Sequence, residues 1–357
     1  MKLLSVVVLL SLTWRFAPAF GADEYRYPAA GERQRALVIY GTTDIDAILP
    51  VLRDFQRSWP DIELRYTHFI TREMYERFRR EADGAGGSPA DIVLSSAMDL
   101  QVKLVNDGYA AKYVSTQTRA LPSWARWRDE AFAFTHEPAV LVYNPTVLRP
   151  EAVPHTRFDL MALLRNPAAK LRGRVGTYDL VSSAVGYLLA TQDARQSQLS
   201  GALMGELGDA EVSLEGTTAR LLERLESGEL ALLYNVLGSY AQARADAGAR
   251  LKIVLLEDYT LVVSHTAFIA RRAAHPDTAR LFLDYLLSQR GQDLLVRESR
   301  SFSLRPDVGS PFQSAVSSTR LIAPLRPIPL GPGLLVYLDT LKSQQFLRTW
   351  LGSMHKQ

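Results

Sequence analysis

Apolar residues alternate between two spacings along the chain, and this alternation predicts a mixed α/β protein. Residues 36–40, ALVIY, form a short apolar run of the kind found in buried strands. Residues 44–59 follow with apolar side chains three and four positions apart, the spacing of one helical face. Residues 62–66, IELRY, alternate apolar and polar side chains as a half-buried strand does. This order predicts a mostly parallel sheet with helices on its faces.

The same alternation continues to the C-terminal region and divides the chain into two halves. Further strands are predicted at 92–94, 138–144, 173–179, 230–234, 251–256 and 260–271, and further helices at 74–82, 98–106, 184–191, 217–227, 238–247, 275–288 and 335–351. The break between the halves falls near Tyr143–Asn144, and the second half ends near Val263. The helix at 275–288 follows both halves, and if it packs on the first half the chain crosses twice between them.

These boundaries predict two α/β lobes. Residues 36–142 and 264–309 form the first lobe and residues 143–263 the second. Residues 310–357 form a C-terminal helical tail that the pattern does not assign to either lobe. A chain of 357 residues is long enough for about two domains.

The N-terminal segment differs from the rest and predicts export. Lys2 precedes an apolar run from Leu3 to Leu12, and small residues follow near Ala19. Residues 1–21 therefore read as a cleaved signal peptide, which places the mature protein in the periplasm. The apolar run is too short for a membrane anchor, and no cysteine stands near the cleavage point to carry a lipid.

Charge and cysteine content narrow the classes of partner. The chain has 41 basic and 38 acidic residues, and a cut after Gly21 removes Lys2 and Arg15, so the mature balance is +1. Nothing in that balance favours nucleic acid as a partner. The chain has no cysteine, which excludes disulfides, thiol catalysis and cysteine-based metal sites.

The sequence contains no strong catalytic or cofactor motif. Phosphate-loop, dinucleotide and serine-hydrolase signatures are missing. The six histidines have no metal-ligand spacing, and His136–Glu137, which has no evident partner, is interpreted as a loop contact. Because no nucleophile–base pair can be named, we expect a protein that is not an enzyme and needs no cofactor or metal. A periplasmic enzyme stays a minor alternative.

Small polar residues recur where a predicted strand meets a predicted helix. In open α/β sheets such turns lie at the carboxyl ends of the strands, where helix N-termini favour an anion. Thr43 and Asp46 also fit a capping box at the start of the first helix. If the halves face each other, the polar turns line one cleft, and the candidate ligand contacts are Thr42, Thr43, Ser95, Ser96, Thr177, Tyr178, Ser182, Ser183, Tyr234 and Asn235.

At this point the chain resembles the periplasmic solute-binding proteins of ABC transporters, in the iron(III)-type or extracellular solute-binding branch. The segments that carry the resemblance are LVIYGTTDIDAILPVLRDFQRSWPDIELRY, PADIVLSSAMDLQVKLVNDGYAAKY, VLVYNPTVL, LESGELALLYNVLGSYA, AAHPDTARLFLDYLLSQRGQDLL and SFSLRPDV. The resemblance implies a two-lobed type 2 periplasmic binding fold with two hinge crossings. It also implies a monomeric receptor that closes on its solute and delivers it to a membrane permease.

The resemblance also narrows the chemical class of the expected solute. Iron-binding members carry adjacent tyrosines that coordinate the metal, and here Leu237 and Gly238 stand at those positions, with Tyr240 nearby. The closer likeness is to members that bind phosphorylated small molecules. It implies a small phosphorylated or carboxylated anion as ligand, with Tyr143, Tyr178 and Tyr234 as walls or hydroxyl donors. The alternatives are Fe³⁺, or a sensing subunit that presents its ligand to a membrane sensor kinase.

Overall fold

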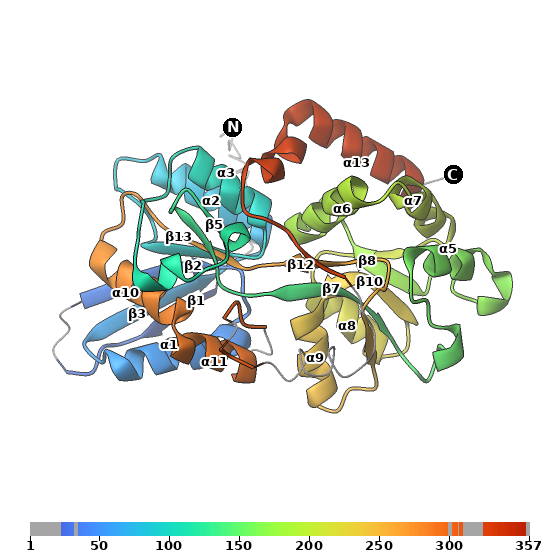
Figure 1. The fold of residues 1–357 in the computed structure, drawn as a ribbon, viewed down its shortest axis with the longest axis horizontal. Helices are drawn as coiled ribbons and strands as arrows, with labels where there is room; N and C mark the ends of the chain where they lie inside the picture. Colours follow the sequence, from blue (N-terminus) through green and yellow to red (C-terminus); the bar gives the residue numbers. More distant parts are fainter. Residues whose placement is uncertain (1–22, 32–34, 299–301, 306, 310–323, 355–357) are drawn as a thin grey trace, which may run out of the picture.

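The protein folds into two lobes, each built on one sheet with helices on both faces (Figure 1). This computed structural model describes residues 23–31, 35–298, 302–305, 307–309 and 324–354. The predicted signal peptide, residues 1–21, lies outside the described residues. The predicted α/β class and the two-lobed arrangement are confirmed.

The first lobe contains a seven-stranded sheet in the order β1-β3-β2-β4-β13-β6-β5. Only β3, β2 and β4 are parallel neighbours, and the other pairings are antiparallel. The strands are β1 (Asp23–Tyr27), β2 (Arg35–Gly41), β3 (Ile62–His68), β4 (Ile92–Ser95), β5 (Arg126–Trp127), β6 (Ala131–Ala133) and β13 (Thr266–Ile269). The helices are α1 (Ile45–Ser58), α2 (Thr71–Ala82), α3 (Met98–Asn106), α4 (Thr116–Arg119), η1 (Ser123–Ala125), α10 (Pro276–Leu287) and α11 (Gln289–Glu298).

The late helix α10 packs in the first lobe, as the two-crossing layout requires. Phe282 of α10 meets Phe55 of α1 edge to face, with ring centroids 5.0 Å apart. Both rings are fully buried because each lies on the apolar face that the helical spacing creates.

The second lobe contains a sheet in the order β14-β12-β7-β10-β8-β9, and β11 pairs with β7 beside this path. Here β10, β8 and β9 are parallel neighbours. The strands are β7 (Glu137–Tyr143), β8 (Val175–Tyr178), β9 (Ser213–Glu215), β10 (Leu232–Leu237), β11 (Lys252–Val254), β12 (Thr260–Val263) and β14 (Leu325–Pro327). The helices are η2 (Pro150–Ala152), α5 (Arg157–Arg165), η3 (Pro167–Ala169), α6 (Ala184–Gln196), α7 (Ser200–Asp209), α8 (Thr218–Glu226) and α9 (Gly238–Asp246).

Two short segments connect the lobes in the hinge. The chain leaves the first sheet after β6 and enters the second at β7, and it returns between β12 and β13 through Ser264 and His265. The break predicted near Tyr143–Asn144 lies one strand too late, because β7 pairs along its length with β10, β11 and β12. The parallel part of each sheet is also smaller than predicted, since the two hinge strands run antiparallel to each other.

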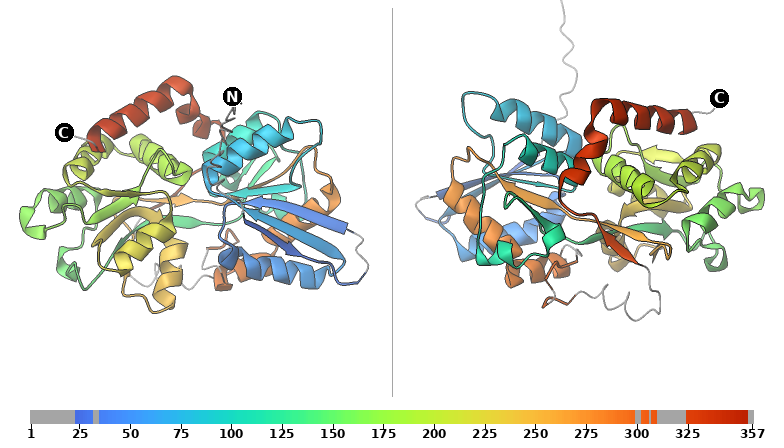
Figure 2. Two further views of the ribbon diagram at one scale, coloured as in Figure 1. Left: turned by 180° about the vertical axis from the view of Figure 1, so that it is seen from behind. Right: turned by 45° about the horizontal axis from the view of Figure 1, so that its top comes forward.

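The C-terminal tail contacts both lobes. Strand β14 pairs with β12, the 3₁₀ helix η4 (Pro332–Leu338) packs on α3, and α13 (Thr340–Met354) lies over α7 (Figure 2). The α13–α7 contact is close, because a Cβ on Gly208 would fall 1.8 Å from the Ser353 carbonyl oxygen. The tail is therefore a third connection between the lobes. Among the described helices, none is long and apolar enough to span a membrane.

Candidate functional site

A cavity of about 790 Å³, including its open mouth, lies between the two lobes. We call it the interlobe cavity. Residues of both lobes and of the hinge line it: Thr42, Asp44, His68, Phe69, Ile70, Thr71, Ser96, Ser182, Ser183, Val185, Gly216, Thr217, Thr218, Ala219, Leu237, Tyr240 and His265. Four of the predicted contacts, Thr42, Ser96, Ser182 and Ser183, are in this set.

Five helices begin at the interlobe cavity, two from the first lobe (α1, α2) and three from the second (α6, α8, α9). Ser183 caps α6 and Thr217 caps α8 with their own hydroxyls. The starts of α1, α2 and α9 have no side-chain cap. The N–H groups of a first helical turn point out of the helix start, so these three helices direct their N-terminal dipoles at the cavity wall without a side-chain cap.

The first-lobe wall forms where β2 and β4 end side by side. Their parallel register pairs Gly41 with Leu94, which brings Thr42 next to Ser95 and Ser96. The Thr42 hydroxyl lies 3.4 Å from the Ser95 hydroxyl and accepts the Ser96 N–H at 3.3 Å. Ser95 is fully buried and also accepts the Ala97 N–H. Ser95 therefore supports the wall from behind, while Thr42 and Ser96 reach the cavity.

Gly41 allows this wall to form. A Cβ at Gly41 would lie 2.3 Å from the hydroxyl oxygen of Tyr66. That hydroxyl donates to the Thr43 carbonyl at 2.5 Å and fixes the loop that follows β2. Any side chain at position 41 would displace Tyr66 and, with it, the loop.

The capping box predicted for Thr43 and Asp46 does not form. The residue that precedes α1 is Asp44, and its side chain makes no capping hydrogen bond. The Thr43 hydroxyl is buried and has no partner. Thr43 lines a smaller chamber of about 450 Å³ behind the interlobe cavity, with Thr135, Glu137, Ser239, Tyr240 and His265. The prediction was wrong because the helix begins one residue later than a Thr43 cap needs.

Asp44 forms a polar contact between the lobes. His68 Nε2 lies 3.4 Å from Asp44 Oδ1, and Tyr240 of the second lobe contacts the same carboxylate. Burial, together with the charges of Asp44 and Glu137, raises the pKa of Tyr240 well above its ordinary value. Tyr240 therefore keeps its proton and donates to Asp44 across the cleft.

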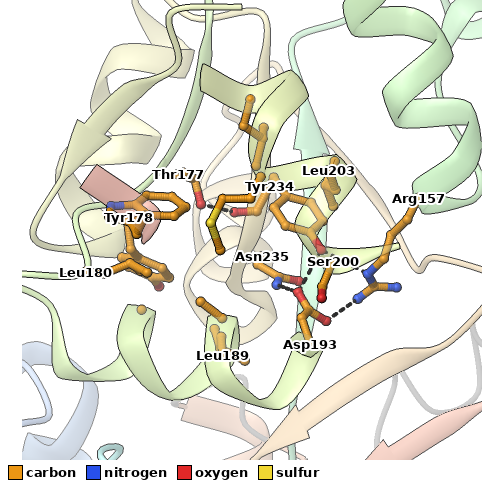
Figure 3. A pocket seen from close by; sticks show the side chains of 15 residues that line it. Arg157, Thr177, Tyr178, Leu180, Leu189, Asp193, Ser200, Leu203, Tyr234 and Asn235 are labelled. Atoms are coloured by element: carbon orange, nitrogen blue, oxygen red, sulfur yellow. Dashed lines mark hydrogen bonds and ion pairs between the residues drawn. The ribbon is translucent and has the colours of Figure 1, made fainter. Parts of the chain in front are cut away.

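Thr177, Tyr234 and Asn235 do not line the interlobe cavity. With Tyr178 they line a second cavity of about 510 Å³ inside the second lobe (Figure 3), and Trp350 of α13 is also part of its lining. We call it the second-lobe cavity. Its polar side is a buried network in which the carboxylate of Asp193 accepts from Arg157 (2.9 Å), Tyr234 (2.7 Å), Tyr259 (2.8 Å) and Asn235 (2.5 Å).

Arg157 is the charge that this network surrounds. Its side chain is 1% exposed and also pairs with Asp258 at 3.0 Å. It stacks on the Tyr259 ring, with Cζ 3.6 Å from the centroid. Each strong donor of the guanidinium thus has a partner inside the lobe, so the network is a structural ion cluster.

A bulge in β10 explains why the prediction failed for Tyr234 and Asn235. The pairing of β10 with β7 shifts between Leu233 and Val236, and Asn235 has φ of 57°. The strand then continues to Leu237. The polar pair marks a bulge inside the strand, whereas the sequence pattern interpreted it as the strand's end. Thr177 likewise lies within β8 and donates to the Tyr234 carbonyl at 3.0 Å.

The remaining predicted residues divide between wall and core. Ser182 and Ser183 line the interlobe cavity at the start of α6, and Ser182 donates to Asp179 at 2.8 Å. Tyr178 lies in the second-lobe cavity, but its hydroxyl bonds the Thr218 hydroxyl, which reaches the interlobe cavity. Tyr143 packs in an apolar cluster at the far end of β7 and lines neither cavity.

Sequence reasoning missed several residues of the interlobe cavity, above all His68, Asp44, Thr217, Tyr240 and His265. Thr217 carried a signal, since a threonine before an apolar-periodic helix is an N-cap. His68 and His265 carried none, because each lies next to its carboxylate partner only in the folded chain.

The chain is similar to a known family along most of its length. The family model described as "bacterial extracellular solute-binding protein" matches residues 37–298. The substrate-binding protein of an ABC transporter from Agrobacterium tumefaciens is 36% identical, with a TM-score of 0.87, over 95% of this chain and 100% of that one. The search of curated proteins finds no match.

Two more distant structures share the fold. Iron-bound HitA from Pseudomonas aeruginosa is 18% identical with a TM-score of 0.70, over 90% of this chain and 99% of that one. AfuA from Actinobacillus pleuropneumoniae, with exogenous fructose-6-phosphate bound, is 16% identical with a TM-score of 0.75 and the same coverage. Proteins of this family act outside the cytoplasm and deliver a solute to a membrane permease. The chain belongs to the bacterial extracellular solute-binding proteins, and it is a substrate-binding receptor of an ABC transporter rather than an enzyme.

Proposed function

We propose that the interlobe cavity binds a small organic anion that carries a phosphate or carboxylate group. The observation that carries the proposal is the meeting of five helix starts at one cavity, three of them without a side-chain cap. Helix N-termini attract anions through free N–H groups and the helix dipole. Thr42, Ser96 and Thr71 add hydroxyl groups to the same wall.

The charges along the cavity are compatible with an anion. Asp44 is the one acidic side chain among the described lining residues, and His68 and Tyr240 already contact its carboxylate. No lysine or arginine of the described part lines the cavity. Binding would therefore depend on backbone donors, hydroxyls and imidazoles, which suit a hydrogen-bonded phosphate or carboxylate.

Closure of the lobes fits the same proposal. The Tyr240–Asp44 contact joins the second lobe to the first across the cavity, and the hinge consists of two short segments. A solute held by helix starts of both lobes stabilises the closed form over the open one, because it gains contacts with the second lobe only on closure.

Fe³⁺ is the alternative that the fold raises, and the side chains disfavour it. Leu237 lines the cavity where the resemblance places an iron-binding tyrosine. The raised pKa of Tyr240 opposes the phenolate that a hard cation prefers. Within the described ranges, no cluster of three or more His, Cys, Asp or Glu side chains is placed to hold a metal ion. A sensing role would use the same cavity, so it differs from transport only in the membrane partner.

The test is a thermal-shift panel on the mature protein with fructose 6-phosphate, glycerol 3-phosphate, 3-phosphoglycerate, malate and Fe³⁺. A solute at a hundred times its Kd should stabilise the protein by about 2.7 kcal/mol. We expect at least one organic anion to do so. A shift with Fe³⁺ and with none of the organic anions would replace this proposal by iron binding.

A further inference from the structure

A buried Glu–His pair joins the two hinge segments below the interlobe cavity. Glu137 is the first residue of β7, and His265 lies between β12 and β13. The side chains of Glu137 and His265 are 1% and 5% exposed. The two residues are 128 positions apart, so the tertiary fold alone brings them together.

The pair is fully hydrogen-bonded on the side away from the cavity. Glu137 Oε1 lies 2.5 Å from His265 Nδ1 and accepts the Thr135 hydroxyl at 2.9 Å. The Ser239 hydroxyl donates to Glu137 Oε2. The His265 N–H donates to the Thr135 hydroxyl oxygen at 2.8 Å. The carboxylate thereby fixes the ring and occupies Nδ1, which leaves Nε2 as the ring nitrogen available to another partner.

His265 belongs to both cavities. It lines the interlobe cavity and the chamber behind it, and Tyr240 is the other residue that they share. Its ring packs on Phe134, with centroids 5.7 Å apart, on the hinge side. A solute that fills the interlobe cavity therefore meets His265 in its wall.

We propose that His265 donates a hydrogen bond from Nε2 to the anionic group of the solute, that Glu137 positions it, and that binding takes up one proton. This inference rests on the proposed function. In the empty protein Nδ1–H donates to Glu137. When the anion binds, Nε2 takes a proton from solvent and the imidazolium lies between two anions, the Glu137 carboxylate and the solute.

The other titratable groups around His265 are consistent with this role. Burial alone would raise the pKa of Glu137, but the His265 imidazole and the hydrogen bonds from Ser239 and Thr135 lower it below its usual value. Glu137 thus stays ionised behind the ring. Tyr240, Asp44 and His68 face the same space, and no described lysine or arginine lines either cavity to neutralise the solute instead.

The experiment measures the affinity of fructose 6-phosphate by calorimetry between pH 7 and 9.5, where the phosphate is doubly ionised. We expect the affinity to fall about tenfold per pH unit above the pKa of the free imidazole, because one proton is linked to binding. His265→Gln should weaken binding at pH 7 and remove the slope. Glu137→Gln should move the start of the fall to lower pH, which a purely structural role would not do.

His155→Gln is the matched control. His155 forms a similar pair with Glu257, with Nδ1 3.1 Å from Oε1, but it is half exposed and lines neither cavity. The affinity of this variant for fructose 6-phosphate, and the dependence of that affinity on pH, should match those of the unchanged protein. A pH-independent affinity, or a folded His265→Gln variant that binds as tightly as the unchanged protein, would overturn the inference.

NMR titration of the His265 ring in the unchanged protein covers the case in which the hinge variants do not fold. The pKa should rise when malate or fructose 6-phosphate is added, and an unchanged pKa would contradict the inference. If no anion of the panel binds, the proposed function has failed. If the anion binds and the pKa of His265 does not change, the inference alone has failed and the proposed function stands.

Discussion

The interlobe cavity and the second-lobe cavity have similar residues but opposite organisation. Both contain threonine, serine and tyrosine, and the sequence pattern assigned polar residues of both cavities, such as Thr42 and Thr177, to one site. In the second-lobe cavity, Asp193 and Arg157 pair with each other and with the surrounding hydroxyls. In the interlobe cavity, three helix starts have no side-chain cap, and no lysine or arginine of the described part lines the wall. A polar residue at a strand end therefore indicates a binding site only if its side chain is not already hydrogen-bonded to a buried charge.

Among the tests of this comparison, a substitution of Arg157 should have the largest effect on stability. Arg157→Met should lower the free energy of unfolding by about 3–5 kcal/mol, because it leaves Asp193 buried without its cation. The measurement is denaturant unfolding. Solute affinity of the folded variant should not change, since Arg157 lies outside the interlobe cavity.

Arg165→Met is the control for Arg157. Its pair with Glu206 involves an arginine side chain that is 57% exposed, so the loss of stability should be far smaller than that of Arg157→Met, because solvent screens an exposed pair. Equal losses in the two variants would mean that the buried network is solvated and that the comparison is mistaken.

The next effect concerns the tail, which contributes to the second-lobe cavity. Trp350 is buried at 4% exposure and lines the cavity. Trp350→Ala should cost about 3 kcal/mol of unfolding free energy, measured by thermal unfolding, without loss of solute affinity. Leu341→Ala on the same helix removes a side chain that is 73% exposed and should change little. Weakened solute binding in Trp350→Ala would show that the two cavities are coupled.

Asp99 offers an effect on stability that depends on pH. This α3 carboxylate is 3% exposed, and burial raises its pKa to about 7, although the Leu100 N–H and the charge of Arg72 oppose the shift. The folded state therefore holds a proton that the unfolded state has lost, and stability falls as pH rises from about 4 to about 7.

Asp99→Asn should remove this dependence. The variant should be more stable than the unchanged protein at pH 8, by about 4 kcal/mol, and the difference should vanish near pH 4. Unfolding at both pH values provides the measurement. A destabilised variant at pH 8 would mean that Arg72 pairs with Asp99 as fully as Asp193 pairs with Arg157.

The test with the smallest expected effect replaces each of two threonines by valine. The sequence pattern predicted both as ligand contacts. Thr177→Val loses a buried hydrogen bond to the Tyr234 carbonyl and should cost about 1 kcal/mol of stability. It should not alter solute affinity. Thr42→Val should weaken binding of the panel anion severalfold, because its hydroxyl orders the Ser95–Ser96 turn and lines the cavity. The reverse pattern of losses would exchange the roles of the two cavities.

The local spacing of apolar residues was sufficient to predict the two-lobed α/β architecture. Apolar spacing located α1, α10 and most strands because burial of one face requires that spacing whatever the rest of the chain does. The strand-end rule also selected Thr42 and Ser96, and both line the interlobe cavity because β2 and β4 are parallel neighbours whose ends meet.

The same rule failed where the backbone departed from regular geometry. The bulge at Asn235 and the late start of α1 after Thr43 each move a polar residue by one position. A shift of one residue in a strand turns a side chain to the other face of the sheet. The local amino-acid composition does not predict such a one-residue shift.

The chain's own pattern of apolar and polar residues was enough to specify two α/β lobes, a late helix that returns to the first lobe, and a receptor without thiol chemistry. Which polar residues face the solute depended on long-range contacts. Glu137 meets His265, Asp44 meets Tyr240, and the Arg157–Asp193 pair holds Tyr234 and Asn235 in the lobe interior. In each of these contacts a charged side chain has partners that are distant in the sequence, and they become neighbours only when the sheets, the hinge and the tail have assembled.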